Sequence, residues 1–139
     1  MLGPGPSNVP ASVLKVMSTP LMGHLDAQFL EICEEVKDLL RYVWKTNNAM
    51  TIPISGTGSA AMETCVANLV NEGDKILICT NGYFGLRFKD MCERHKGVVV
   101  SIEVDWGCVF SDQEVEAALL KHKPDMLFIV HAETSTGAL

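Results

Sequence analysis

The chain has 139 residues, of which 47% are hydrophobic and 20% are charged, and its formal net charge is −6. This length and composition predict about one globular domain with a full hydrophobic core. The acidic balance argues against a nucleic-acid partner, which requires a basic face. No apolar run approaches the roughly 18 residues of a membrane span, so no membrane partner is expected.

Residues 1–10, MLGPGPSNVP, are expected to form an arm, because proline and glycine disfavour both helix and central strand. A short helix is expected over residues 11–18. Apolar side chains then recur at helical spacing from Phe29 to Val43, which predicts a long helix that ends near Lys45.

The rest of the chain alternates apolar segments with amphipathic ones. Strands are expected over residues 50–54, 75–80, 97–104 and 125–131. Helices are expected over residues 59–71, from the NGYFG segment to about residue 95, and over 111–121, where Ser111 and Glu114 have capping-box spacing. This alternation predicts an α/β fold with a mostly parallel sheet and flanking helices.

The cysteines are odd in number and form no CxxC pair, which predicts reduced core thiols rather than a disulfide framework. They are Cys33, Cys65, Cys79, Cys92 and Cys108. We therefore expect an intracellular, soluble protein, with peroxisome, mitochondrion and cytoplasm all open as its compartment. The four histidines lack metal-ligand spacing, so no metal site is expected.

Three loops that follow expected strands are chemically unusual: SGTGS, TNGYFG and HAETSTG. Ligands of parallel sheets bind at the carboxyl ends of the strands. The loops supply backbone N–H groups at a helix start, an aromatic pair beside a glycine, and a cluster of hydroxyls. Together they indicate a site for a planar, phosphorylated ligand.

In SGTGS, Gly56 and Gly58 allow close approach of the backbone, and the first helical turn presents free N–H groups to an anion. Two alternatives stay open for this loop. Gly56-x-Gly58-x-x-Ala61 fits the dinucleotide fingerprint, although the next strand ends in Thr80-Asn81 instead of the acidic residue that would bind the ribose. In the second alternative, the SGTGS loop is a turn that binds no ligand.

Other candidate residues also have structural interpretations. Tyr83 and Phe84 fit core packing, and the hydroxyls of residues 134–136 fit a capped turn. Arg87 is expected in a structural ion pair, Glu133 in local hydrogen bonds, and His131 at a polar strand end.

Taken together, the segments LGPGPSNVP, ISGTGSAAMET, NGYFGLRF, KHKPDMLFIVH and ETSTG resemble the alanine–glyoxylate / serine–pyruvate aminotransferase family. These are class-V, fold-type I enzymes that use pyridoxal 5′-phosphate (PLP). The resemblance implies an N-terminal arm and short helix over residues 1–26. It implies that residues 27–139 are the first part of the PLP-binding large domain, and that the protein is a homodimer.

The resemblance also implies roles for single residues in cofactor binding. The backbone of Thr57, Gly58 and Ser59 would bind the phosphate of PLP. Phe84 would stack on the pyridine ring, where many relatives have tryptophan, and Thr134 would hydrogen-bond near the phenolic oxygen.

Substrate binding is implied for residues nearer the N-terminus. Gly5, in the GPGPSN arm, would line the substrate entrance. Gly23 and His24 would lie near the active site across a dimer interface.

No catalytic residue is expected in this chain, because the family's Schiff-base lysine follows the STG loop. We therefore expect the N-terminal portion of a longer transaminase, inactive by itself, whose parent moves an amino group from alanine or serine to glyoxylate or pyruvate. Two alternatives are a 3-hydroxykynurenine transaminase-like enzyme and a non-catalytic α/β module that binds a phosphorylated ligand.

Overall fold

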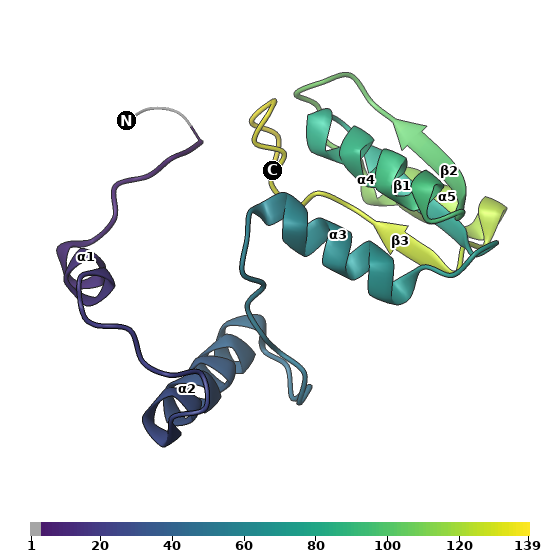
Figure 1. Ribbon diagram of the computed structural model, residues 1–139. Coiled ribbons are helices and arrows are strands. Elements are labelled where there is room, and N and C mark those ends of the chain that lie inside the picture. Colours follow the sequence, from purple (N-terminus) through teal and green to yellow (C-terminus); the bar gives the residue numbers. More distant parts are fainter. Residues whose placement is uncertain (1–3) are drawn as a thin grey trace. The chain divides into compact units, whose positions relative to one another are not determined.

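A computed structural model describes residues 4–139, so the first three residues of the expected arm lie outside the described part (Figure 1). The chain divides into two compact units, Met1–Ile54 and Ser55–Leu139. The first unit contains the two predicted helices, α1 (Ala11–Met17) and α2 (Ala27–Trp44), and neither helix has a buried residue. The domain boundary after residue 26 stays a prediction.

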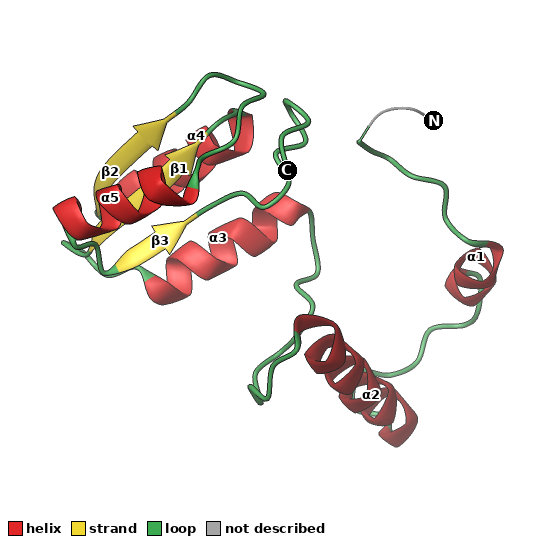
Figure 2. Ribbon diagram, turned by 180° about the vertical axis from the view of Figure 1, so that it is seen from behind, coloured by secondary structure: helices red, strands yellow, loops and turns green. Residues whose placement is uncertain are grey.

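The second unit is a parallel sheet with flanking helices, as predicted (Figure 2). Its elements in chain order are α3 (Gly58–Leu69), β1 (Lys75–Thr80), α4 (Tyr83–Arg94), β2 (Val98–Glu103), α5 (Asp112–His122) and β3 (Met126–Phe128). The strand order is β2-β1-β3, with Ile76 of β1 opposite Val99 on one side and Met126 on the other. The strand β1 is therefore central and hydrogen-bonded along both edges.

The order in which strands are added to the sheet reverses at β1. Helix α4 leads from β1 to β2 on one side of the sheet order, and α5 leads from β2 past β1 to β3 on the other. In open parallel sheets, ligands bind outside the carboxyl ends of the strands where the order reverses. That position here lies between the segments that leave β1 and β3.

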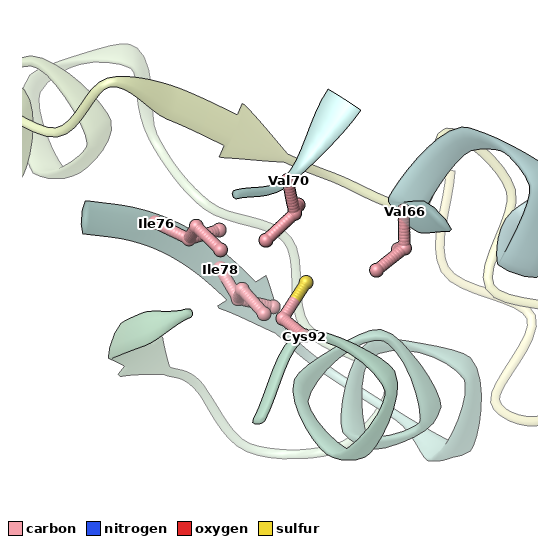
Figure 3. Close-up of a cluster of buried hydrophobic side chains, with 5 residues drawn as sticks. All are labelled: Val66, Val70, Ile76, Ile78 and Cys92. Carbon is pink, nitrogen blue, oxygen red and sulfur yellow. The ribbon is translucent and has the colours of Figure 1, made fainter. Parts of the chain in front are cut away.

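The core is built on alternate side chains of β1, because successive residues of a strand point to opposite faces. Ile76 and Ile78 pack with Val66 and Val70 of the α3 segment and with Cys92 of α4 (Figure 3). Leu77 and Cys79, also buried, point to the other face. Helix α5 packs on β1 there and contributes the buried Ala118 (Figures 1 and 2). Both faces of the central strand are thus covered.

The capping box predicted at α5 is present. The Ser111 hydroxyl accepts from the Glu114 N–H at 3.3 Å, and the Ser111 N–H donates to the Glu114 carboxylate at 2.8 Å. These two bonds satisfy backbone donors that a helix start leaves free. They fix where α5 begins.

The strand expected over residues 50–54 is not formed, so that prediction is wrong. Met50 is 79% exposed and Ile52 is 48% exposed, and Pro53 has no N–H to donate to a ladder. The Thr51 N–H bonds locally, to the carbonyl of Ala49. An apolar segment becomes a strand only where it pairs with another strand, and residues 50–54 pair with none within residues 4–139.

The cysteines are all free, as predicted, but they are not all in the core. Cys79 and Cys92 are buried, and burial, with smaller contributions from Glu63 and Glu93, raises the pKa of the Cys92 thiol to about 11. Cys65 and Cys108 are exposed, contrary to expectation. Among residues 4–139, no helix has the length and apolar composition needed to cross a membrane.

Removing core volume at β1 should cost stability. Ile78→Ala is expected to lower the free energy of unfolding by about 2–5 kcal/mol, because Ile78 is fully buried between α3 and α4. Leu120→Ala, at a position 69% exposed on α5, should change it by less than about 0.5 kcal/mol. Urea unfolding followed by circular dichroism measures both, and equal losses would contradict this assignment of the core.

Candidate cofactor site

An open pocket of about 750 Å³ lies at the carboxyl ends of β1 and β3. The start of α3, the first turns of α4 and the segment after β3 all contribute to its lining. The polar part of the lining includes Thr57, Ser59, Arg87, His131 and Thr134. The pocket therefore brings together all five residues predicted to bind the cofactor, since Gly58 and Phe84 also line it.

The start of α3 has donors available for a ligand. Thr57 is the N-cap residue, and its hydroxyl and carbonyl accept from the N–H of Ala60 at 3.4 and 2.9 Å. The N–H groups of Gly58 and Ser59 donate to no acceptor within residues 4–139. A Cβ on Gly58 would meet nothing within 4 Å, so there is open space beside these donors. Gly56, with φ of 154°, provides the turn into the helix.

The starts of the other two helices in this unit are less suited to an anion. At α4, Tyr83 N–H donates to the Ser135 hydroxyl at 2.9 Å, and Phe84 N–H donates to the Glu133 carboxylate at 2.9 Å. At α5, the Ser111 hydroxyl accepts only from the N–H of Glu114, but the first turn carries Asp112 and Glu114, whose negative charges oppose an anion there. Of the three helix starts in the second unit, only that of α3 combines free N–H groups, open space at Gly58 and a first turn without an acidic residue.

Arg87 places a positive charge beside the start of α3. Its guanidinium donates to the Ser59 hydroxyl and lies 4.9 Å from the ring centroids of both Tyr83 and Phe84. The ion pairs formed within residues 4–139 do not include Arg87, so the predicted structural ion pair is wrong. Packing of α4 against α3 directs this side chain to Ser59 instead. A cation next to the positive end of a helix dipole favours an anion between them.

The two aromatic residues Tyr83 and Phe84 have different surroundings. Tyr83 is 52% exposed, whereas Phe84 is partly buried and lines the pocket. The two rings meet edge to face, with centroids 5.9 Å apart. Neither ring belongs to the hydrophobic core cluster, so the core-packing interpretation does not hold for this pair.

The hydroxyl cluster after β3 has a mixed role. Thr136 donates to the carbonyl of Asn81 at 3.5 Å, and Ser135 bonds to Glu133 and Tyr83, as a capped turn would require. Thr134 lines the pocket, and its hydroxyl forms no hydrogen bond within the described part of the chain. Thr134 is therefore the member of this cluster that a ligand can reach.

Glu133 is fully buried and makes the hydrogen bonds that were predicted for it. Burial opposes ionisation of its carboxyl, but hydrogen bonds from Ser135, Gly85 and Phe84 outweigh that effect and hold its pKa below the ordinary value. Two of these donors come from the start of α4, about fifty positions earlier in the chain. Sequence patterns predicted the bonding but not this distant partner.

The dinucleotide interpretation of the glycine loop finds no support in the fold. The fingerprint requires a strand before the glycine turn, and residues 50–54 form none. At the end of β1, Thr80 bonds to Ser101, and the Asn81 amide donates to the Cys108 carbonyl at 3.0 Å. These side chains bond to strand β2 and to the loop that follows it.

The residues predicted to bind substrate belong to the first unit. Gly5 and His24 are exposed, and Gly23 N–H donates to the Asp26 carboxylate at 2.7 Å in a tight turn. Their role in substrate binding stays a prediction.

Comparison with known proteins agrees with this geometry. The family model for class-V aminotransferases matches residues 2–139. The chain belongs to the class-V aminotransferase family. Its members and structural neighbours are PLP-dependent fold-type I enzymes, so the predicted family and fold class are confirmed.

Three relatives illustrate the similarity. The chain is 42% identical over 139 residues to the alanine–glyoxylate aminotransferase of Mus musculus, covering all of this chain and 34% of that protein. A solved alanine–glyoxylate aminotransferase from Nostoc sp. has a TM-score of 0.94 at 53% identity, covering 98% of this chain and 36% of the other. A ureidoglycine–glyoxylate aminotransferase structure from Bacillus subtilis has a TM-score of 0.94 at 38% identity, covering 97% and 35%. The chain thus spans about a third of the length of these class-V relatives.

Glu133 should make the stability of the chain depend on acid pH. Its pKa is lower in the folded than in the unfolded state, so its stabilisation is present above the unfolded pKa and is lost as the pH falls through the folded pKa. We expect Glu133→Gln to flatten the decline in unfolding free energy below the ordinary glutamate value of about pH 4.3. Urea titrations at a series of pH values measure this.

The matched control is Glu116→Gln, at an exposed position on α5. This variant should keep the acid-dependent decline of the unmodified chain. The interpretation fails if the two variants show the same pH dependence.

Proposed function

We propose that residues 55–139 form the phosphate- and ring-binding part of a PLP-dependent aminotransferase that uses glyoxylate or a similar 2-oxo acid as amino acceptor. One observation supports this most strongly. The open start of α3, the unpaired charge of Arg87 and the ring of Phe84 line a single pocket at the reversal point of the sheet.

The residues in the pocket fit the parts of PLP. The N–H groups of Gly58 and Ser59 would bind the phosphate, with the helix dipole of α3 and the charge of Arg87 favouring its negative charge. Phe84 would lie against the pyridine ring, and the free hydroxyl of Thr134 would bond to a polar group on the ring edge. Bound PLP supplies an electron sink for the carbon that exchanges the amino group.

A dedicated lysine is the group that this pocket lacks. Within the described part of the chain, none of the eight lysines lines the pocket. Transamination requires a lysine to hold the cofactor covalently and to move the proton. We infer that this lysine is supplied by a part of the enzyme outside these 139 residues, so the chain by itself binds without catalysing.

The names of the relatives support a choice of substrates. Those of Mus musculus and Nostoc sp. are named for alanine and glyoxylate, and that of Bacillus subtilis for ureidoglycine and glyoxylate. Glyoxylate is common to all three names, which supports it as the acceptor. We propose alanine or serine as the donor, a homodimer as the active form, and Gly5, Gly23 and His24 as residues near the substrate.

Blocking the open space at Gly58 should weaken cofactor binding. Gly58→Glu would fill the space beside the free N–H groups and place a negative charge there, and the lost helix-start electrostatics alone are worth up to about 2 kcal/mol. We expect PLP affinity, measured by equilibrium dialysis, to fall sharply. Ala67→Glu, at an exposed position near the other end of α3, adds the same charge and should leave the affinity unchanged. Unchanged PLP binding in Gly58→Glu would refute the phosphate assignment.

The chain should also fail to trap the cofactor covalently. After incubation with PLP and reduction with borohydride, we expect no single lysine to be modified stoichiometrically, because no lysine lines the pocket. Alanine and glyoxylate should show no turnover. Mass spectrometry of the peptides measures the first result, and one uniquely pyridoxylated lysine together with turnover would show that the chain is a complete catalyst.

A further inference from the structure

Glu133 organises the turn after β3 through its backbone. Its N–H donates to the Ala138 carbonyl at 2.9 Å, and its carbonyl accepts from the N–H of Gly137 at 2.8 Å and of Thr136 at 3.1 Å. The turn of residues 133–138 is therefore closed on Glu133 itself. The side chain is left to reach outside the turn.

The carboxylate of Glu133 joins this turn to the start of α4. One oxygen accepts from the N–H of Phe84 at 2.9 Å and of Gly85 at 3.2 Å. The other accepts from Ser135, from its N–H at 3.2 Å and from its hydroxyl at 2.5 Å. The Ser135 hydroxyl also accepts from the N–H of Tyr83 at 2.9 Å. Glu133 and Ser135 therefore accept the hydrogen bonds from the first three N–H groups of α4.

Two glycines make this approach possible. A Cβ on Gly82 would lie 2.4 Å from Cγ of Glu133 and 2.7 Å from the Ser135 hydroxyl. A Cβ on Gly85 would lie 2.9 Å from Cα of Thr80, at the end of β1. All three distances are shorter than a real Cβ tolerates. The glycines on either side of Tyr83-Phe84 thus let β1, α4 and the turn meet closely.

Glu133 does not itself line the pocket, but its direct neighbours in this network do. The N–H of Phe84 is bonded to its carboxylate, and Thr134 is the next residue in the chain. We propose that Glu133 is a positioning residue, which fixes the Phe84 ring and the Thr134 hydroxyl relative to each other by joining the start of α4 to the 133–138 turn. The effect of Glu133 on PLP binding rests on the function proposed above, whereas its role in joining α4 to the 133–138 turn does not.

Amide hydrogen exchange of the 139-residue chain, without any ligand, tests whether Glu133 joins the start of α4 to the 133–138 turn. In Glu133→Gln, the N–H groups of Phe84, Gly85 and Ser135 should exchange about tenfold faster or more, because charge-assisted bonds are replaced or lost. The N–H of Ile78, in the sheet, should exchange as before, and Glu116→Gln should change none of these rates. Unchanged exchange at Phe84 and Gly85 would overturn the proposal.

Ser135→Ala provides a second variant in case Glu133→Gln does not fold. It removes the hydroxyl that bonds both Glu133 and Tyr83, so the N–H of Tyr83 should exchange faster while that of Ile78 does not. Equal rates in this variant and the unmodified chain would likewise overturn the proposal.

A ligand-binding experiment compares PLP with inorganic phosphate. Glu133→Gln should weaken the binding of PLP several-fold and that of inorganic phosphate less, because two of the phosphate donors, at Gly58 and Ser59, lie on α3 and only Arg87 lies on α4. Equal effects on the two ligands would show a general structural role and contradict positioning of the ring. If the unmodified chain binds no PLP, the proposed function fails, and the exchange rates still decide whether Glu133 joins the two segments.

Discussion

The second unit depends on the pairing of β1 with a parallel strand along each of its edges. The strand β1 is buried on both faces and pairs with β2 along its whole length and with β3 over Ile76–Ile78, so it is fixed between its two neighbours. The segments that leave β1 and β3 must then run side by side. This adjacency brings the start of α4 to the 133–138 turn and places both next to the start of α3.

The polar groups at this edge fall into two sets with different tasks. The buried carboxylate of Glu133 and the exposed hydroxyl of Ser135 form hydrogen bonds that join backbone segments, and the burial of Glu133 requires such partners. The groups that face the pocket, at Gly58, Ser59 and Thr134, keep bonding capacity unused. Arg87 combines the two, since it binds Ser59 and leaves its charge without an acidic partner within residues 4–139. An anion-binding pocket needs both kinds of group: those that hold the backbone in place and those that remain free to bind the anion.

Local patterns predicted most of the fold. The apolar runs of β1 and β2 and the capping box of α5 were identified because each signal lies within a few consecutive residues. The strand over residues 50–54 failed because strand formation depends on a partner, which a single segment does not reveal. Phe84 and Thr134 line one pocket because their loops follow the adjacent strands β1 and β3, whereas residues 57–59 follow no strand and lie there because α3 packs against α4. The partners of Arg87 and Glu133 were missed since they lie 28 and about 50 positions away and depend on how α4 packs.

The central claim is that the start of α3 recognises a phosphate group. The most direct measurement compares the affinity of the 139-residue chain for PLP and for pyridoxal, which has the same ring without the phosphate. Both ligands can contact Phe84 and Thr134, but only PLP can use the free N–H groups of Gly58 and Ser59 and the charge of Arg87. The account predicts that PLP binds at least about tenfold more tightly, and that added inorganic phosphate competes with it. Equal affinities for PLP and pyridoxal, with no competition by phosphate, would contradict it.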